Sequence, residues 1–318
     1  MENSSIAMQL CHKIFHQLSS AIVGKEAEIE RLLIAVLAGG HILLEDVPGT
    51  GKTQLVKSLA NTIGGQFRRI QCNPDLLPSD ITGVSIFHPA QQQFVFRSGP
   101  VHTNVLLADE INRATTKTQS ALLEAMEEGY VTVDGEGHKL PEPFILLATQ
   151  NPIEFEGTYT LPEAQLDRFM LKLRLGYPSP QDEQKMIQHT NSIHPADGLQ
   201  PLMEIEQLLV IRDLVQQVHL DDVIAQYIIK IIGSTRSHPY LMLGASPRAS
   251  ISLAKAVKAR AFLYQRNYVL PDDVKQLFPH IIGHRVLLSM EARLQGVNVN
   301  QVLEQMLTTV DVPLFVQR

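Results

Sequence analysis

The residues best suited to chemistry lie in the segment His41–Thr53, which reads HILLEDVPGTGKT. A short apolar run bounded by turn-forming residues predicts a buried strand, and Gln54–Ile63 behind it predicts a helix. The glycines between them let backbone N–H groups converge on an anion near the start of that helix. We therefore predict a phosphate-binding loop made of Pro48, Gly49, Thr50, Gly51, Lys52 and Thr53.

Two side chains of this loop have roles that follow from their chemistry. The Lys52 ammonium would contact the terminal phosphates of a nucleotide, and the Thr53 hydroxyl would bind Mg²⁺. The strict pattern G-x-x-x-x-G-K-[ST] is nevertheless broken, because Asp46 stands where its first glycine would be. Support for a nucleotide site must therefore come from other segments as well.

An acidic pair ends the second apolar run, NVLLADEINRA over residues 104–114. Because successive side chains of a strand point to opposite faces, Asp109 and Glu110 could serve separate purposes. Asp109 would hold Mg²⁺ through water, and Glu110 would orient or deprotonate the attacking water. An isolated pair of this kind could simply cap a helix. Beside a phosphate loop of the same sheet, the catalytic interpretation is favoured.

Asn151 ends a further buried run, FILLATQNP over residues 144–152. It could hydrogen-bond the γ-phosphate or the attacking water, although Asn-Pro is also ordinary turn chemistry. Arg248 lies in GASPRA, where Ser246 fits an N-cap and Pro247 the first helical position. A cation in a first turn is disfavoured by about 0.3–1 kcal/mol, which a shared anion would offset. We expect Arg248 to contact phosphate as a lid closes over the nucleotide; the alternative is a solvated arginine.

Arg168, in LPEAQLDRFM, precedes the last strand-like segment of the first half of the chain. A guanidinium that reaches the γ-phosphate of another subunit can raise the hydrolysis rate by several powers of ten. The alternative is a local surface pair between Asp167 and Arg168, and Arg113 is a rival for the contact between subunits. Nearby acidic residues read as a solvated helix face: Glu124, Glu127 and Glu128.

Strands alternate with helices through the first half of the chain, which predicts an α/β fold with a mostly parallel sheet and helices on both faces. The expected strands are 42–45, 67–71, 104–108, 144–149 and 169–173. Two β-hairpins, over 85–96 and 130–140, interrupt the alternation and could face a substrate or a neighbouring subunit. Prolines after Gly176 place a domain boundary there, between an α/β domain over 1–176 and an all-helical lid over 177–318.

Composition narrows the class of protein. The chain has 318 residues, of which 44% are hydrophobic and 19% charged, as in soluble globular proteins. A formal net charge of −6 makes a nucleic-acid partner unlikely on electrostatic grounds. We expect no membrane span and a cytoplasmic protein, because neither a long apolar run nor a signal peptide is visible. Cys11 and Cys72 are expected to be reduced thiols.

With these elements in this order, the chain resembles the AAA+ ATPases and, among them, the MoxR family. The strings that carry the resemblance are LLEDVPGTGKT, LLADEINRATTKTQSALLEAMEEGYVTVDG, LLATQNPIEFEGTYTLPEAQLDRFM and GASPRA. MoxR-like sequences often carry an acidic residue before V-P-G, so Asp46 fits this family.

The resemblance implies a role for each motif residue. Walker A falls on Lys52 and Thr53, Walker B on Asp109 and Glu110, sensor 1 on Asn151, the arginine finger on Arg168, sensor 2 on Arg248, and the adenine pocket on Val23 and Gly24. It also implies ATP and Mg²⁺ as cofactors and a hexameric ring with nucleotide between subunits.

MoxR-like proteins are thought to be chaperone-like. The resemblance thus implies remodelling of a protein partner, such as a von Willebrand A domain protein, or assistance in cofactor or metal insertion. One alternative is a nucleic-acid motor of the helicase-like AAA+ branch. The absence of clustered Lys and Arg from the hairpins argues against it. Another is a scaffold that binds ATP without hydrolysing it, which the acid pair and Arg168 disfavour.

Overall fold

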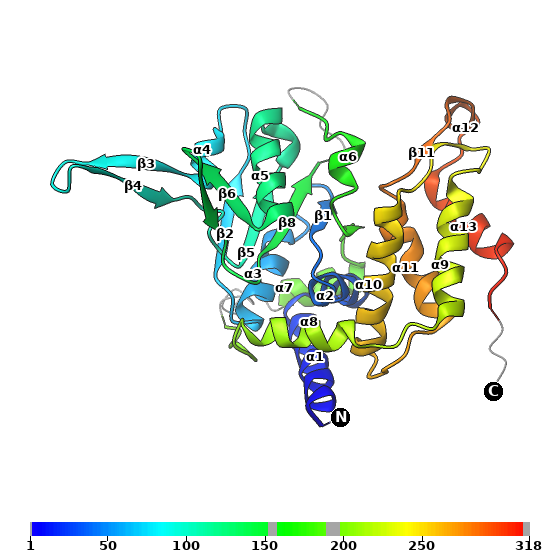
Figure 1. The fold of residues 1–318 in the computed structure, drawn as a ribbon. Helices are drawn as coiled ribbons and strands as arrows, with labels where there is room; N and C mark the ends of the chain where they lie inside the picture. Colours follow the sequence, from blue (N-terminus) through cyan, green and yellow to red (C-terminus); the bar gives the residue numbers. More distant parts are fainter. Residues whose placement is uncertain (1, 152–157, 189–197, 314–318) are drawn as a thin grey trace.

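Five parallel strands form the central sheet of the chain. The computed structural model describes residues 2–151, 158–188 and 198–313 (Figure 1). Within them the strand order is β2-β5-β8-β1-β9, with every neighbouring pair parallel. The strands are β1 (Ile42–Glu45), β2 (Phe67–Gln71), β5 (Val105–Asp109), β8 (Ile145–Gln150) and β9 (Leu171–Leu173). The predicted α/β class is confirmed.

The apolar runs of the sequence become central strands because both faces of the sheet are covered. In β5, Val105 and Leu107 point into one apolar core, and Leu106 and Ala108 into a second core on the opposite face. The first core includes residues of α1 (Glu2–Ala21), α2 (Glu26–Leu37) and α3 (Lys52–Thr62). The second includes residues of α4 (Pro78–Thr82) and α5 (Thr116–Glu128).

Polar side chains gather at the carboxyl edge of this sheet. Gln71 of β2 stands opposite Asp109 of β5, and Glu45 of β1 stands opposite Gln150 of β8. In open α/β sheets, ligands bind at this edge, so its loops are the first place to look for a site.

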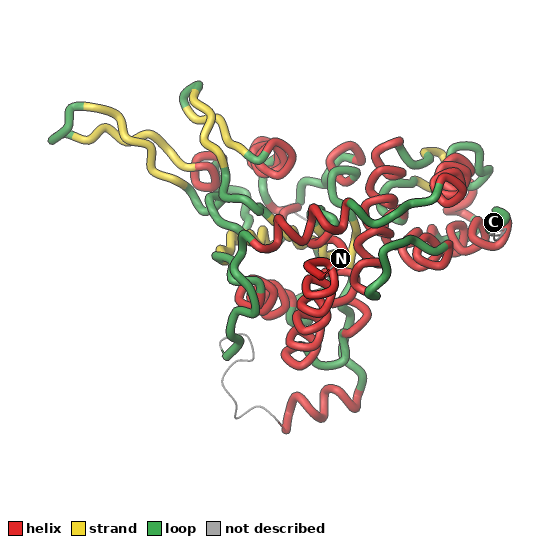
Figure 2. The backbone as a smooth tube through the Cα atoms, turned by 60° about the horizontal axis from the view of Figure 1, so that its bottom comes forward, coloured by secondary structure: helices red, strands yellow, loops and turns green. Residues whose placement is uncertain are grey.

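Both predicted hairpins are present, and the first projects far from the body of the molecule (Figures 1 and 2). It consists of β3 (Gly83–His88) and β4 (Gln93–Ser98). The second consists of β6 (Tyr130–Val133) and β7 (Glu136–Lys139), joined by a two-residue turn. Asp134 and Gly135 both have positive φ, 52° and 83°, as this tight hairpin turn requires.

The C-terminal part is mainly helical, where an all-helical lid was predicted, and α10 and α11 lie side by side in it (Figure 1). Its helices are α7 (Pro180–Gln188), α8 (Gln207–Gln216), α9 (Asp222–Thr235), α10 (Pro247–Leu263), α11 (Pro271–Ile282), α12 (Met290–Leu294) and α13 (Val299–Thr309). An unexpected two-stranded ladder joins β10 (Leu241–Leu243) to β11 (Leu287–Leu288). Helix α11 continues past Pro279, because Phe278, Ile281 and Ile282 are buried and their packing outweighs the interruption at the proline.

Packing is continuous across the predicted domain boundary. A single apolar core joins Leu33 of α2, Leu208 of α8 and Leu253 of α10. The core has no gap at residue 176, and the domain boundary there stays a prediction. Among the described residues, no helix is both long and apolar enough to cross a membrane.

Candidate active site

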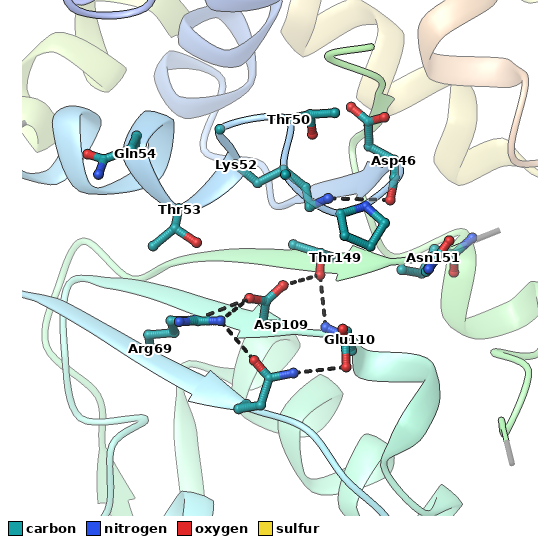
Figure 3. A pocket seen from close by; sticks show the side chains of 15 residues that line it. Asp46, Thr50, Lys52, Thr53, Gln54, Arg69, Asp109, Glu110, Thr149 and Asn151 are labelled. Atoms are coloured by element: carbon teal, nitrogen blue, oxygen red, sulfur yellow. Dashed lines mark hydrogen bonds and ion pairs between the residues drawn. The ribbon is translucent and has the colours of Figure 1, made fainter. Parts of the chain in front are cut away.

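A cavity of about 280 Å³ opens at the carboxyl edge of the sheet (Figure 3). Three of the predicted motifs meet there, because they follow the neighbouring strands β1, β5 and β8. The lining residues are Asp46, Pro48, Gly49, Thr50, Gly51, Lys52, Thr53, Gln54, Arg69, Gln71, Asp109, Glu110, Thr149, Gln150 and Asn151. The phosphate loop, the acid pair and Asn151 are thus brought together.

The loop after β1 has the backbone conformation that its glycines allow. Gly49 and Gly51 have φ of 85° and 87°, and Gly51 is the N-cap residue of α3. A side chain at such a φ costs about 1–2 kcal/mol, which glycine avoids. Lys52 reaches back over the loop, and its Nζ donates to the carbonyl of Val47 at 2.6 Å and more weakly to that of Asp46 at 3.3 Å. Its ammonium is thereby held at the cavity wall.

Asp46, the departure from the general loop pattern, has a definite structural role. Asp46 is only 8% exposed. Oδ1 accepts a hydrogen bond from the Val47 N–H at 2.8 Å, and Oδ2 accepts from the N–H groups of Leu175 and Gly176 at 2.9 and 2.8 Å. The carboxylate therefore ties the phosphate loop to the chain that leaves β9, which a glycine could not do.

Val23 and Gly24 are not among the residues that line this cavity. Gly24 lies beside α7: a Cβ on Gly24 would stand 2.3 Å from Oδ2 of Asp182. Next to them, Lys25 Nζ donates to the carbonyls of Leu175 and Tyr177, the second at 3.0 Å. Their role at an adenine base stays a prediction.

The acid pair does reach one cavity, but not by strand alternation as expected. Strand β5 ends at Asp109, and Glu110 adopts a left-handed conformation with φ 56° and ψ 50° before the short helix η1 (Ile111–Arg113). A non-glycine residue in this region stores on the order of 1 kcal/mol or more of strain. The Thr149 hydroxyl joins the two residues: it donates to Asp109 Oδ1 at 2.6 Å and accepts from the Glu110 N–H at 2.8 Å.

Two further residues of the site, Arg69 and Gln71, were not found from the sequence. Arg69 forms an ion pair with Asp109 at 2.6 Å, and its Nη2 also donates to Gln71 Oε1 at 2.9 Å. Gln71 Nε2 in turn donates to Glu110 Oε2 at 2.9 Å. Their i, i+2 spacing at the end of a predicted strand places both on one face, and this was the available signal.

Glu110 and Asn151 have further surroundings within the same chain. Arg113 Nη1 lies 3.4 Å from Glu110 Oε2, so this rival for the intersubunit contact stands beside the acid of its own chain. Asn151 follows β8, is 9% exposed and lines the cavity. Pro152, which completes the predicted Asn-Pro turn, lies outside the described residues.

Glu45 gives this edge of the sheet a buried negative charge just before the loop. It accepts hydrogen bonds from Gln150 and Arg174, both at 2.9 Å, and pairs with Lys172 at 3.1 Å. Burial alone would raise the pKa of Glu45, but Lys172, Arg174 and Gln150 together hold it below its ordinary value.

Arg168 and Arg248 meet at Glu127, and neither of them lines the cavity. Arg168 Nε is 3.0 Å from Oε2 of Glu127, and Arg248 Nη2 contacts the other oxygen of the same carboxylate. Glu127 is exposed, as expected of a solvated helix face, but this residue of α5 also joins a core arginine to a lid arginine, which was not predicted. Nothing in its helical spacing distinguishes it from Glu124 or Glu128.

The alternative for Arg168, a surface pair with Asp167, is wrong. The Asp167 carboxylate accepts from Arg285 Nε at 2.7 Å and from the Ser246 hydroxyl at 2.8 Å instead of pairing with its neighbour in sequence. Ser246 is the N-cap residue of α10, as predicted, but its side chain makes no capping bond because it is used for this contact. The core and the lid thus meet at Asp167.

Comparison with family models finds two matches. Residues 41–171 match the ATPase family associated with various cellular activities (AAA), and residues 233–306 match the AAA lid domain. The first range contains the cavity motifs and Arg168, and the second contains Arg248 and Arg285.

Several known proteins are similar over almost the whole chain. Uncharacterized protein YeaC of Bacillus subtilis is 49% identical, over 96% of this chain and 95% of that protein. Chaperone MoxR1 of Mycobacterium tuberculosis is 37% identical, over 98% of this chain and 85% of that one. A crystal structure of a candidate ATPase from Cytophaga hutchinsonii, 39% identical, superposes with a TM-score of 0.91 and covers 98% of both chains.

Proposed function

Because the chain belongs to the MoxR family of AAA+ ATPases, we propose that it hydrolyses ATP with Mg²⁺ and uses the energy to remodel a protein partner. One observation carries the hydrolysis: Lys52, Thr53, Asp109, Glu110 and Asn151, from three separate segments, line one cavity.

The phosphate loop would hold the nucleotide phosphates. Backbone N–H groups from Gly49 to Thr53 and the start of α3 provide donors and a favourable dipole for an anion. Lys52 would release the carbonyl of Val47 and donate to the terminal phosphates. The acid of the loop itself, Asp46, keeps its carboxylate turned to backbone N–H groups, so the Lys52 ammonium is left for the phosphates.

The donor set also suits Mg²⁺, which prefers oxygen ligands. The Thr53 hydroxyl and the Asp109 carboxylate line the same cavity, and Asp109 already contacts one cation, the Arg69 guanidinium. We propose that Thr53 and Asp109 hold the metal, with water between the metal and Asp109. Bound Mg²⁺ would offset the negative charge of the phosphates.

Glu110 is the proposed base for the attacking water, and Asn151 is proposed to position the γ-phosphate or that water. Gln71 and Arg113 contact the Glu110 carboxylate, and its N–H is held by Thr149. These contacts, with the strained backbone at Glu110, fix the direction of the carboxylate and limit its freedom before the reaction.

Arg168 and Arg248 are proposed to act on the nucleotide of a neighbouring subunit. Both lie outside the cavity of their own chain, and both contact the single carboxylate of Glu127. Two guanidiniums that share one anion in this way could share a phosphate group. This modifies the expectation for Arg248, which was to close a lid over its own nucleotide. The arrangement supports a ring, and we propose a hexamer.

A protein partner is supported by the relatives and by the first hairpin. One relative is named a chaperone. The hairpin β3–β4 exposes large apolar side chains, among them Phe87 and Phe94 at 50% and 72% exposure, where a nucleic-acid contact would need cations. We propose a protein substrate, such as a von Willebrand A domain protein or a complex that receives a cofactor or metal. No observation favours a nucleic-acid motor. The two buried free thiols fit the proposed cytoplasmic location.

The hydrolysis is tested by steady-state phosphate release with Mg²⁺ and ATP, together with fluorescent-nucleotide binding. Glu110→Gln should bind ATP with unchanged affinity while kcat falls about 10²-fold or more. Lys52→Ala should weaken ATP binding itself. Hydrolysis by Glu110→Gln at the unaltered rate would refute the proposed base.

The partner is tested with the same Glu110→Gln protein in ATP, used as a trap for affinity capture from native lysate. Lys52→Ala is the matched control, because it should not reach the ATP-bound form. Recurrent capture of a von Willebrand A protein by the trap alone would support the proposal. Capture of DNA or RNA, with binding that weakens steeply as salt rises, would contradict it.

A further inference from the structure

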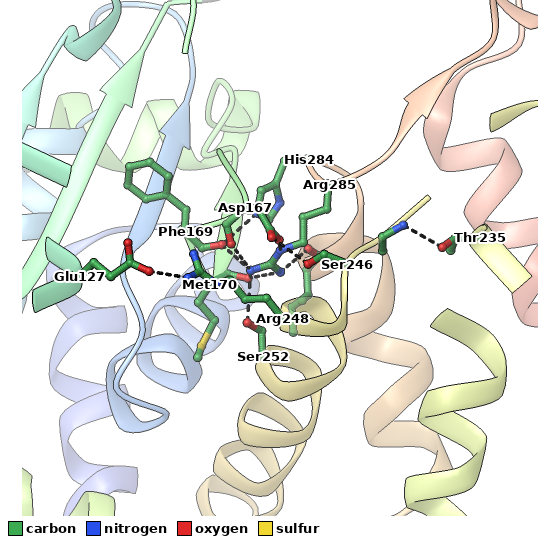
Figure 4. Close-up of polar contacts among 12 residues, drawn as sticks. Glu127, Asp167, Phe169, Met170, Thr235, Ser246, Arg248, Ser252, His284 and Arg285 are labelled. Carbon is green, nitrogen blue, oxygen red and sulfur yellow. Dashed lines mark hydrogen bonds and ion pairs between the residues drawn. The ribbon is translucent and has the colours of Figure 1, made fainter. Parts of the chain in front are cut away.

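The buried side chain of Arg285, which belongs to the lid, binds the segment that leads into β9 (Figure 4). Its Nε donates to Asp167 Oδ1 at 2.7 Å, and its Nη2 to the main-chain carbonyls of Asp167 and Phe169 at 3.0 and 2.7 Å. Its Nη1 donates to the carbonyls of Met170 and Ile281 at 3.0 and 2.7 Å. Arg285 follows α11, so all but the last of these bonds run from lid to core.

These contacts use every donor of the guanidinium, which has five N–H groups in a rigid plane. A sixth contact joins Nη2 to the Ser252 hydroxyl of α10 at 3.2 Å. The side chain is 1% exposed, and burial lowers the pKa of Arg285 to about 10, so it remains charged at neutral pH. A lysine has three donors at a single point and could not span the same carbonyls.

Other lid groups contact the same segment. His284 Nε2 donates to the carbonyl of Phe169 at 3.0 Å, and the Ser246 hydroxyl donates to Asp167 Oδ2 at 2.8 Å. The lid thus binds polar atoms on both sides of Arg168 in sequence, while the Arg168 side chain itself extends to Glu127.

The lid also carries the second arginine of the pair. Arg248 lies in the first turn of α10, two residues after Ser246, and meets Arg168 at Glu127. The relative position of the two guanidiniums therefore depends on how α10 and the segment before β9 are joined. Arg285 spans that junction with four hydrogen bonds to residues 167–170, so it is the side chain best placed to set this position.

We propose that Arg285 is a positioning residue for Arg168: it locks the segment 167–170 to the lid so that Arg168 and Arg248 reach one phosphate of the neighbouring subunit together. The proposal rests on the proposed function, because it presumes that these arginines act between subunits. It adds that the orientation of the lid controls the arginine finger, and hence hydrolysis in the next subunit rather than in its own.

A purely structural role makes a different prediction. If Arg285 only fastened the lid, its loss would loosen α10 and damage the nucleotide site of its own chain. If it positions Arg168, its loss leaves the chain's own cavity competent and damages the site that receives the arginine. Mixed rings distinguish the two, because each site takes its cavity from one subunit and its arginines from another.

The experiment mixes Arg285→Lys with Glu110→Gln and measures phosphate release. Alone, Arg285→Lys should lose about 10²-fold in kcat, as a displacement of about 1 Å can produce, with ATP affinity unchanged. In an equal mixture, about a quarter of the sites combine an intact Glu110 with an intact arginine pair, so activity should rise toward about a quarter of the unaltered protein.

Two controls fix the interpretation. Arg168→Ala mixed with Glu110→Gln should recover activity in the same way, since it removes the finger directly. Arg266→Lys changes an arginine of the lid that pairs with Asp273 at 2.7 Å, far in sequence from Arg168, and should leave hydrolysis unchanged. Should Arg285→Lys fail to fold, Ser246→Ala takes its place, with a few-fold loss that mixing also restores.

Each outcome is decisive. Unaltered hydrolysis by Arg285→Lys, or a loss that mixing fails to restore while the Arg168→Ala mixture recovers, would overturn the positioning role alone. Failure of the Arg168→Ala mixture would overturn the intersubunit arginines of the proposed function, and the positioning role with them.

Discussion

The cavity at the sheet edge and the arginine pair at Glu127 are built in different ways. The cavity collects residues from the ends of adjacent strands and the loops that follow them, so the sheet alone brings them together. The arginine pair needs the lid, because Arg248 comes from α10 and the segment that carries Arg168 is held by Arg285. In a site of this design the cavity can stay rigid on the sheet, while the arginine pair moves with the lid.

The two regions also differ in the group that anchors each of them. Asp46 anchors the loop through three backbone N–H groups of the core and of the segment after β9. Asp167 anchors the arginine side through two lid side chains, Arg285 and Ser246. The first anchor should matter for binding nucleotide, and the second for hydrolysis in a neighbour.

The largest effect is expected from Arg168→Ala. Loss of a guanidinium that stabilises the transition state should lower kcat by about 10³-fold or more, with little change in ATP affinity. Phosphate release and nucleotide binding measure the two quantities separately. A large loss of ATP affinity with an intact kcat would instead assign Arg168 to the binding half and erase the difference between the regions.

A smaller effect is expected from Asp46→Asn. The amide keeps one acceptor but turns an NH₂ group toward backbone donors, so folding should lose about 1–3 kcal/mol. ATP affinity should fall about tenfold as the loop loosens. Chemical denaturation and nucleotide titration measure these, with the exposed Asp75→Asn as matched control. Equal behaviour of the two variants would show that Asp46 does not anchor the loop.

Two histidines outside the cavity, His41 before β1 and His284 after α11, predict a dependence of stability on pH. Burial, with Arg212 nearby, lowers the pKa of His41 to about 4, and burial beside Arg285 lowers the pKa of His284 well below its usual value. In the unfolded chain both protonate near pH 6.5, so the stability due to their neutral forms is complete above that pH. It is lost as pH falls toward the folded pKa, at up to about 1.4 kcal/mol per pH unit for each group.

Thermal unfolding measured between pH 7 and pH 5 tests this. His41 Nδ1 accepts from the Leu146 N–H at 3.0 Å, a bond that protonation would remove and that an asparagine oxygen could replace. His41→Asn should therefore flatten the slope. An unchanged slope would mean that His41 is not held neutral.

The smallest effect is expected from the first hairpin, which belongs to neither region. Phe87 and Phe94 lie with ring centroids 5.5 Å apart and are exposed. Replacing both with serine should leave basal hydrolysis within about twofold, as for most surface changes. Capture of a partner by the Glu110→Gln trap should be lost. A large fall in basal hydrolysis would contradict this and show that the hairpin, like the cavity and the arginine pair, contributes to hydrolysis.

Much of the cavity could be predicted because its parts are local in sequence. Runs such as Ile42–Glu45 and Val105–Asp109 are buried on both faces, so their apolar character marks the strands, and each polar residue after them falls at the same edge. Arg69 and Gln71 were missed although their strand was predicted, because they lie within β2 and not in a polar segment that follows an apolar run.

The contacts of single side chains were harder to predict. Strand alternation could not foresee the left-handed backbone of Glu110, which depends on the Thr149 hydroxyl of another strand. Helical periodicity could not separate Glu127 from Glu124 and Glu128, because its partners are Arg168 and Arg248, far away in sequence. Arg285 has no local signal at all.

The sequence by itself determined the α/β class, the phosphate loop, the acid pair and the family, because each depends on residue types at short spacing. Only the tertiary structure decided that Asp46 is an anchor, that Arg69 and Gln71 belong to the site, and that Arg248 stands with Arg168 rather than over its own cavity. The reason is physical: hydrogen bonds and ion pairs act over about 3 Å, and only the packing of the lid on the core sets which distant residues come that close.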